Sequence, residues 1–237
     1  MRVLLLIVLL FVQQGWATEV EPLTDWQVYQ LKEQVKKMAV IRISENGNIE
    51  REEIEFDRQG YKTVKKIFRN NTGINSVSAE MKFFSKERYM PYNNNKRWVL
   101  TGDEEDVEVE LSNMNRTNEY WFADGQHITI NMGPTHEVYV KEIYSNENKL
   151  LSQETKISIK WDDSEYNSIS KNLFTYDKEG ELIRTDIKAS VDEIETEGYQ
   201  IFEVQKRDKQ GNIILRTVEN YTEEPSYKES FTYEYYN

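Results

Sequence analysis

FTYDKEGELIRTDI, residues 174–187, decides the fold: it contains an aromatic strand, a turn of the form D-x-x-G and a second strand. The same pattern, called the cassette below, recurs as IRISENGNIEREEIEF (41–56), EFDRQGYKTVKKIF (55–68) and VQKRDKQGNIILRTV (204–218). A fifth copy without glycine is IYSNENKLLSQETKI (143–157). Two strands joined by a tight glycine turn are typical of an antiparallel β-hairpin. The repetition therefore predicts an all-β chain built from hairpins.

The turn residues of the cassette explain why it forms hairpins. Gly180 and Gly211 can adopt the positive φ that tight turns require. Asp177 and Asp208 precede them by three positions and can accept hydrogen bonds from the turn backbone. Asn148 takes the glycine position in the fifth copy, and the spacing from it to the two glycines is 32 and then 31 residues. This near-constant spacing predicts duplicated two-strand units.

Short connections between the expected strands predict a repetitive antiparallel β-hairpin meander that forms a long curled sheet. From Val138 to the end, strands follow one another regularly, with one face buried and the other wet. The segment of about 70–137 is irregular by comparison: we expect a loop-like connection over Arg88–Gly102 and a short strand at Val107–Leu111. Residues Thr18–Lys37 predict either a short helix, capped by Thr24 or Asp25, or an extended lead-in.

The first 17 residues, MRVLLLIVLLFVQQGWA, have the pattern of a cleavable signal peptide. A basic residue precedes ten apolar residues, which are too few to span a bilayer, and Gly15-Trp16-Ala17 resembles a cleavage site. An uncleaved anchor is the alternative. The sequence thus predicts a signal peptide at 1–17 and one β-repeat domain at 18–237, with a periplasmic or secreted location and no membrane insertion after cleavage.

Composition limits the classes of partner. The chain has no cysteine and a net charge of −12, and loss of residues 1–17 leaves 29 basic against 42 acidic side chains, a net charge of −13. Disulfides and thiolate metal sites are excluded. A surface this acidic repels phosphate backbones, so nucleic acid is not expected as a partner.

The cassettes resemble those of bacterial secreted YD-repeat (Rhs-like) β proteins. The matching segments are EFDRQGYKT (55–63), FTYDKEGELIRT (174–185) and RDKQGNIILRTVENYTEEPSYKESFTYEYY (207–236), together with the opening LKEQVKKMAVIRISENGNIE (31–50). The resemblance covers roughly residues 31–69 and 138–237. It implies side-by-side strand–turn–strand units and an extracytoplasmic location, and it implies no catalytic residues.

Few residues suggest chemistry. His127 and His136 flank Gly133-Pro134, but without a third strong ligand they do not predict a metal site. Chance pairs of carboxylates are expected among 42 acidic residues, and no nucleophile or phosphate-binding motif occurs. Trp26, Trp98, Trp121 and Trp161 would form either packed core or a sugar-stacking face. We expect no cofactor and no metal, although the densest acidic run leaves calcium open.

We therefore expect a non-catalytic protein-binding module that holds a partner with a basic surface. One version is an immunity-type protein that neutralises a toxin. The alternative is a cell-envelope structural or carbohydrate-binding protein, and an enzyme with paired carboxylates in a pocket is a third hypothesis. The possible partner-contact residues are those of the acidic run, Asp103, Glu104, Glu105 and Asp106.

Overall fold

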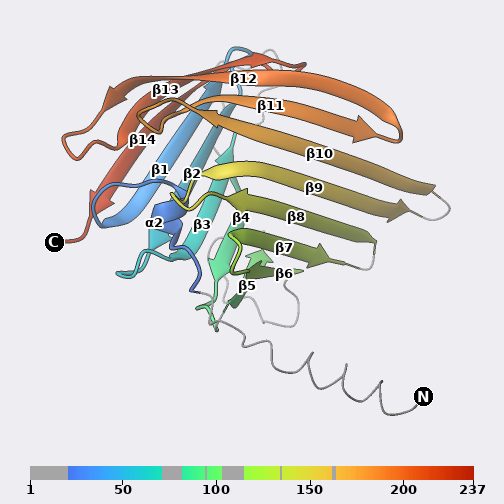
Figure 1. The fold of residues 1–237 in the computed structure, drawn as a ribbon, viewed down its shortest axis with the longest axis horizontal. Coiled ribbons are helices and arrows are strands. Elements are labelled where there is room, and N and C mark those ends of the chain that lie inside the picture. The colour runs from blue at the N-terminus through green and yellow to red at the C-terminus, as the bar shows by residue number, and fades with distance from the viewer. Residues whose placement is uncertain (1–20, 71–81, 94, 103–114, 134, 162–163) are drawn as a thin grey trace, which may run out of the picture.

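The computed structural model describes residues 21–70, 82–93, 95–102, 115–133, 135–161 and 164–237. Within these ranges, fourteen strands form a closed antiparallel barrel, in which each strand pairs with its neighbours in the sequence (Figure 1). The first seven strands are β1 Val35–Ser44, β2 Ile49–Phe56, β3 Lys62–Arg69, β4 Lys82–Tyr89, β5 Lys96–Gly102, β6 Asn115–Trp121 and β7 Gln126–Met132. The others are β8 His136–Tyr144, β9 Leu150–Trp161, β10 Ser164–Tyr176, β11 Leu182–Val191, β12 Ile194–Arg207, β13 Ile213–Tyr221 and β14 Tyr227–Tyr235.

The prediction of an all-β antiparallel meander is confirmed, but the prediction of a long curled sheet is wrong because the sheet is closed. The last strand, β14, pairs with the first, β1, and places Phe231 opposite Val40 and Glu229 opposite Arg42. Closure satisfies the hydrogen-bonding groups along both outer strands, which an open sheet would leave unpaired. The meander therefore has an inside and an outside instead of two equivalent faces.

The turn of the 41–56 cassette, between β1 and β2, lies at the mouth end of the barrel. The other four cassette turns, at residues 57–60, 145–148, 177–180 and 208–211, gather at the opposite end, because alternate connections of an up-and-down barrel lie at the same end. In these turns, Oδ1 of Asp57, Asp177 or Asp208 accepts hydrogen bonds from the backbone N–H groups two and four residues later. The hydroxyl oxygen of Ser145 accepts the equivalent two bonds in the fifth copy, where Asn148 has φ of 62°. The near-constant spacing of 31 or 32 residues is therefore one complete passage up and down the barrel wall.

Side chains alternate between the two faces of the wall, as the pleat of a strand requires. On β10, Lys171 and Leu173 are exposed on the outside, whereas Asn172 and Phe174 are partly buried on the inside. Lys171 forms an ion pair with Glu154 of β9 at 3.4 Å. The outer face of this part of the wall is thus charged as well as apolar.

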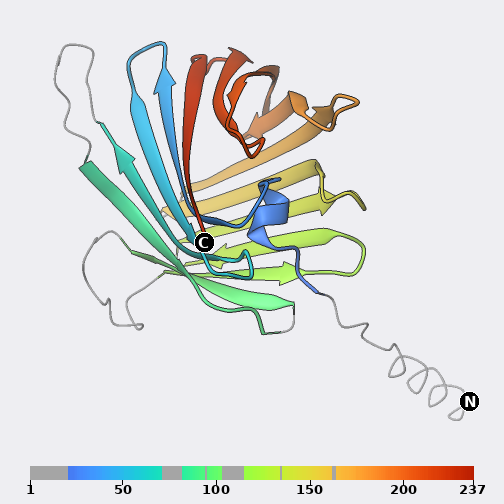
Figure 2. The ribbon, with the colours of Figure 1, turned by 90° about the vertical axis from the view of Figure 1, so that its left-hand side faces the viewer.

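The N-terminal segment closes the end at which the cassette turns gather. It contains α2, Asp25–Val28, a helix of four residues in which Thr24 is the N-cap of a capping box with Gln27. The expected helix within Thr18–Lys37 is therefore confirmed only as this single turn. Figure 2 views the molecule from the side on which α2 lies, and in this view the helix falls within the outline formed by the strands.

Trp26 anchors the helix to the barrel wall. Its indole nitrogen donates to the backbone oxygen of Val35 at 2.8 Å, and its backbone N–H donates to the oxygen of Gly60 at 3.1 Å. The indole packs against the main apolar cluster, whose buried members are Val35, Met38, Val40, Ile54 and Phe56. The core therefore lies directly beneath α2 at this end of the barrel.

Of two finer predictions for this region, one needs correction and the other is not tested. The expected irregular connection over Arg88–Gly102 is mostly strand, because β4 and β5 form a hairpin with Tyr89 opposite Val99. Pro91, Asn93 and Asn95, which suggested a loop, lie in the turn between these strands. The expected strand at Val107–Leu111 lies outside the described residues.

The turn glycines predict a graded loss of stability on substitution. Gly211 has φ of +92° in open surroundings, with Lys32 Cγ as the neighbour at 3.8 Å from an added Cβ, whereas a Cβ on Gly60 would lie 2.6 Å from the Trp26 ring. We expect Gly211→Val to cost about 1–2 kcal/mol through backbone strain. Gly60→Val should cost more, because it also displaces Trp26. Chemical denaturation of both variants measures the difference, and equal losses would contradict the role given to Trp26.

Candidate functional site

A belt of paired charges crosses the inside of the barrel on β1, β2, β13 and β14. The Arg42 guanidinium is its centre: Nη1 lies 2.9 Å from carboxylate oxygens of both Glu50 and Glu52, and Nε lies 2.9 Å from Glu229. Arg216 Nε donates to the second oxygen of Glu229 at 2.8 Å. Glu229 is buried, and an unpaired charge there would be costly. The belt is therefore a fixed, internally neutralised feature of the interior.

Beyond the belt, away from α2, lies the mouth cavity, with a volume of about 620 Å³. Its wall is polar, and the side chains of Gln200, Asn220 and Tyr227 lie opposite the ion pair of Arg69 with Glu50, which measures 2.7 Å. The lining residues are Arg42, Ser44, Asn48, Ile49, Glu50, Arg69, Asn70, Gln200, Asn220, Glu224, Pro225 and Tyr227. This volume is within the usual range for small-molecule sites.

One buried acceptor in the mouth cavity lacks a protein partner. The side-chain nitrogen of Asn220 donates to Pro225 O at 2.6 Å, but its Oδ1 is buried and accepts no hydrogen bond from the described residues. Buried polar atoms in folded proteins nearly always have a partner. Because this oxygen has almost no accessible surface, a molecule in the cavity would reach it only after a movement of the Asn220 side chain.

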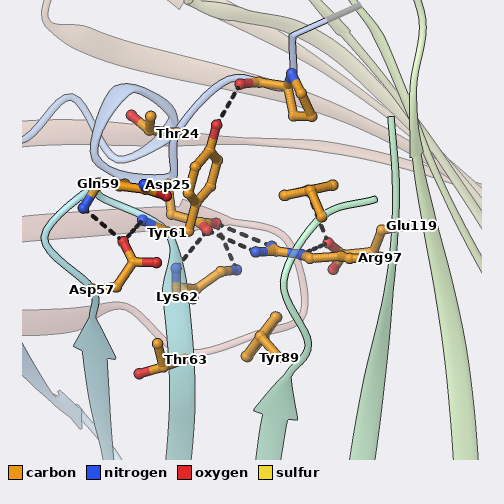
Figure 3. Close-up of polar contacts among 12 residues, drawn as sticks. Thr24, Asp25, Asp57, Gln59, Tyr61, Lys62, Thr63, Tyr89, Arg97 and Glu119 are labelled. Atoms are coloured by element: carbon orange, nitrogen blue, oxygen red, sulfur yellow. Dashed lines mark hydrogen bonds and ion pairs between the residues drawn. The ribbon is translucent and has the colours of Figure 1, made fainter. Parts of the chain in front are cut away.

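A second group of charges ties α2 to the wall, and Figure 3 shows its polar contacts. Asp25 of the helix is buried and accepts from Arg97 Nη1 at 3.0 Å and from the backbone N–H of Lys62 at 2.8 Å. Lys62 Nζ lies 3.2 Å from the same carboxylate. Burial raises the pKa of Asp25, but the charges of Lys62 and Arg97 outweigh it and hold the pKa below its usual value.

The same network continues along β6, β7 and β8. Arg97 also donates to Glu119 at 2.5 Å, and Glu119 lies 3.8 Å from Nε2 of His127. Nδ1 of His127 lies 2.8 Å from Glu142, and its ring stacks on Trp121 with centroids 4.5 Å apart. Burial lowers the pKa of His127, but the neighbouring carboxylates Glu119 and Glu142 outweigh this effect and raise the pKa above its usual value.

Paired acids, a histidine and a lysine are also the components of many active sites. Here each charged side chain faces an opposite charge, and the mouth cavity is lined by other residues. The geometry therefore supports a structural role, in which Asp25 and its two cations form a latch that fixes α2. Among the described residues, no group of three His, Cys, Asp or Glu is placed to hold a metal ion.

The candidate site residues proposed from the sequence lie away from the mouth cavity or outside the described ranges. Asp103, Glu104, Glu105 and Asp106 lie outside the described residues, so their proposed contact with a partner stays a prediction. The two histidines do not converge: His127 belongs to the network above, and His136 contacts Asn131 at 3.3 Å. The sequence reasoning missed the belt and the latch, because their partners are far apart in the sequence: Arg97 is 72 residues from Asp25, and Glu229 is 187 residues from Arg42.

The tryptophans divide between the two roles expected for them. Trp121 is buried and Trp26 packs on the core, whereas Trp98 is exposed on β5. The described tryptophans therefore do not form one sugar-stacking face.

Comparison with known proteins leaves the family open. No protein-family model matches the chain, and no curated protein matches it. Among solved structures, it is similar to a porin-like protein from Bacteroides uniformis ATCC 8492, with a TM-score of 0.44 and 11% identity, over 86% of this chain and 99% of that chain. A score this low carries no functional conclusion, and the resemblance to YD-repeat proteins stays a prediction. No helix within the described ranges is long and apolar enough to cross a membrane.

The latch predicts a large effect of Asp25→Asn. The change removes a buried negative charge that faces two cations, and loss of one partner of a buried pair typically costs about 3–5 kcal/mol. We expect a clear fall in the free energy of unfolding, measured by denaturant titration. Asp186→Asn is the matched control, because Asp186 pairs with Arg184 on the exposed wall, and it should leave stability unchanged. Equal effects of the two variants would contradict the latch.

The raised pKa of His127 predicts a pH dependence. A histidine whose pKa is higher in the folded state stabilises the fold fully below its unfolded value of about 6.5 and loses this contribution as pH rises through the folded pKa. We expect the unfolding free energy of the wild type to fall over that range and that of His127→Gln to fall less. The side chain of His136 has no carboxylate contact among those described, so His136→Gln should retain the wild-type slope. Denaturation at a series of pH values tests this.

Proposed function

We propose that the protein is a non-catalytic, water-facing barrel that binds a small, uncharged, hydroxyl-rich molecule, such as a saccharide, in its mouth cavity. The observation that carries this proposal is the cavity of about 620 Å³, which is lined mainly by polar side chains. Small-molecule sites are concave and place a few polar groups to orient the ligand. This corresponds to the carbohydrate-binding alternative considered from the sequence.

The pairing of charges favours a neutral ligand. Arg42 and Arg69 already contact Glu50, so an anionic ligand would have to compete with that carboxylate for both guanidinium groups. The side-chain amide of Gln200 can both donate and accept hydrogen bonds, and so can each hydroxyl group of a saccharide. Tyr227 adds an aromatic ring to the same wall. A saccharide has the hydroxyl groups to use each of these features.

The outer wall supports an aqueous location. Successive strands place Glu154, Lys171, Lys188 and Glu197 on the outside, where Lys171 contacts Glu154 and Lys188 contacts Glu197 at 2.6 Å. A lysine facing the middle of a bilayer from a barrel costs about 2–4 kcal/mol. With the signal peptide expected at 1–17, this favours a periplasmic or secreted protein. The first residues of the mature protein, near Thr18, can be identified by mass measurement.

The protein-partner hypothesis stays a separate prediction. Its expected contact residues, Asp103 to Asp106, are acidic, so association with a basic partner should slow as salt screens the long-range attraction. Immunity to a toxin is one form of this hypothesis. The mouth cavity favours a small ligand, because it lies within the barrel and not on a broad outer surface.

The cavity predicts a selective loss of binding in Gln200→Leu. Leucine has a similar size but cannot hydrogen-bond, so the affinity for a neutral saccharide that uses this amide should fall at least about tenfold, the effect of losing one or more hydrogen bonds. The measurement is calorimetric titration of the mature protein with a panel of neutral mono- and disaccharides.

Gln205→Leu is the matched control, because Gln205 lies on the same strand but is exposed. It should bind as the wild type does. The proposal fails if no saccharide of the panel binds, or if both variants lose affinity equally.

A further inference from the structure

A second cavity, called the inner chamber here, lies on the other side of Arg42 from the mouth, directly beneath α2. Its volume is about 280 Å³, and Arg42 lines both cavities and marks where they meet. Residues Val28 to Lys32 form its wall at the α2 end. Apolar and aromatic side chains from the strands form much of the rest: Met38, Val40, Leu150, Phe174, Tyr176, Leu182, Ile213, Phe231 and Tyr233.

Many of these side chains face unfilled space. Met38 and Val40 are 2% and 3% exposed, as in a packed core, whereas Phe174, Leu182 and Ile213 remain only partly buried although α2 covers this end. Protein interiors are normally close-packed, and apolar groups that line a void lose their contacts on one side. An apolar molecule in the chamber would restore those contacts.

Except for Lys32 of the N-terminal segment, the charged groups that line the chamber are paired with one another. Arg42 contacts Glu52 and Glu229, Arg216 contacts Glu229, and Arg207 forms an ion pair with Glu181. A cationic ligand would have to separate one of these pairs, and an anionic ligand would meet only Lys32 outside them. The chamber therefore favours a neutral occupant, and its aromatic walls favour an apolar one.

We infer that the inner chamber is a binding site for a small, uncharged, apolar molecule, with an aromatic ring system or a short alkyl chain. An apolar cavity of about 150 Å³ accommodates benzene, and this chamber is larger, so a two-ring aromatic compound is a suitable probe. This site is distinct from the polar mouth cavity and does not depend on the function proposed there.

The N-terminal segment from Asp25 to Lys32 is the lid of this chamber. It is held at both ends by polar contacts: the Asp25 latch at one end and, at the other, Asn212, which accepts from Lys32 N–H at 2.6 Å and donates to Lys32 O at 2.9 Å. Gln30 and Glu33 have φ of 54° and 62°, a conformation that costs energy for residues other than glycine. Gln30 lies within this segment and Glu33 directly after it.

The test uses 1-aminonaphthalene, a fluorescent probe that is uncharged at neutral pH. Titration of the mature protein should give a saturable blue shift in the emission of the probe. Leu182→Trp fills the chamber with a larger side chain. It should therefore raise the dissociation constant of the probe at least tenfold. Leu173→Trp, on the exposed face of the adjacent strand, is the matched control and should stay within twofold of the wild type.

Thermal melts show whether Leu182→Trp is folded, and Ile213→Phe, a smaller enlargement in the same wall, replaces it if it is not. The inference is overturned if the wild type gives no saturable signal, or if the folded chamber variant binds the probe as tightly as the wild type does.

A stopped-flow measurement tests the lid. Asp25→Asn releases the latch without changing a residue that lines the chamber, so the probe should associate severalfold faster than with the wild type at a temperature where both are folded. An unchanged association rate would show that the segment from Asp25 to Lys32 does not control entry.

Discussion

The pairing of β1 with β14 is the constraint on which the rest of this structure depends. Without it, the chain would be a meander with two unpaired outer strands and no enclosed space. The pairing also completes the belt, because Arg42 belongs to β1 and Glu229 to β14. The mouth cavity, the inner chamber and the packed core beneath α2 all include residues of these two strands.

The barrel does not fill its interior uniformly. The main cluster of buried apolar residues lies beneath α2, on β1 and β2, and further buried apolar residues lie on β4, β5, β6, β8 and β13. The wall of β9 to β12 contributes no buried apolar side chain among the described residues. A barrel of this many strands is too wide for side chains from all sides to meet at its axis. Its stability therefore comes from the ladders, from one packed end and from neutralised charge pairs, and the remaining space is open to ligands.

The sequence predicted local structure well, because the turns depend on local chemistry. Asp57, Asp177 and Asp208 each make the hydrogen bonds expected of an aspartate that opens a turn, and the glycines three positions later have positive φ. Closure could not be predicted from the same residues. The number, tilt and stagger of the strands together determine whether a sheet meets itself, and no single hairpin contains that information.

The candidate sites were also beyond sequence reasoning, for a related reason. Residues 50–53 of β2 are four consecutive charged residues, so both faces of this strand carry charge and the sequence does not say which face points inward. Glu50 and Glu52 face the lumen, and Ile54 on the same side of the strand belongs to the core. Partners such as Asp25 and Arg97, or Arg42 and Glu229, are 72 and 187 residues apart, so only the assembled wall brings them together.

Closure of the wall by the two ends of the chain also determines when the protein can become complete during its synthesis. The register pairs Val35 with Tyr235, so nearly the whole chain must be present before the final ladder forms. Contacts this distant in sequence fold slowly, because a large loop must close first. Until then β1 has one unpaired edge. The charges of Lys37 and Arg42 on that strand would limit its association with other chains during this interval.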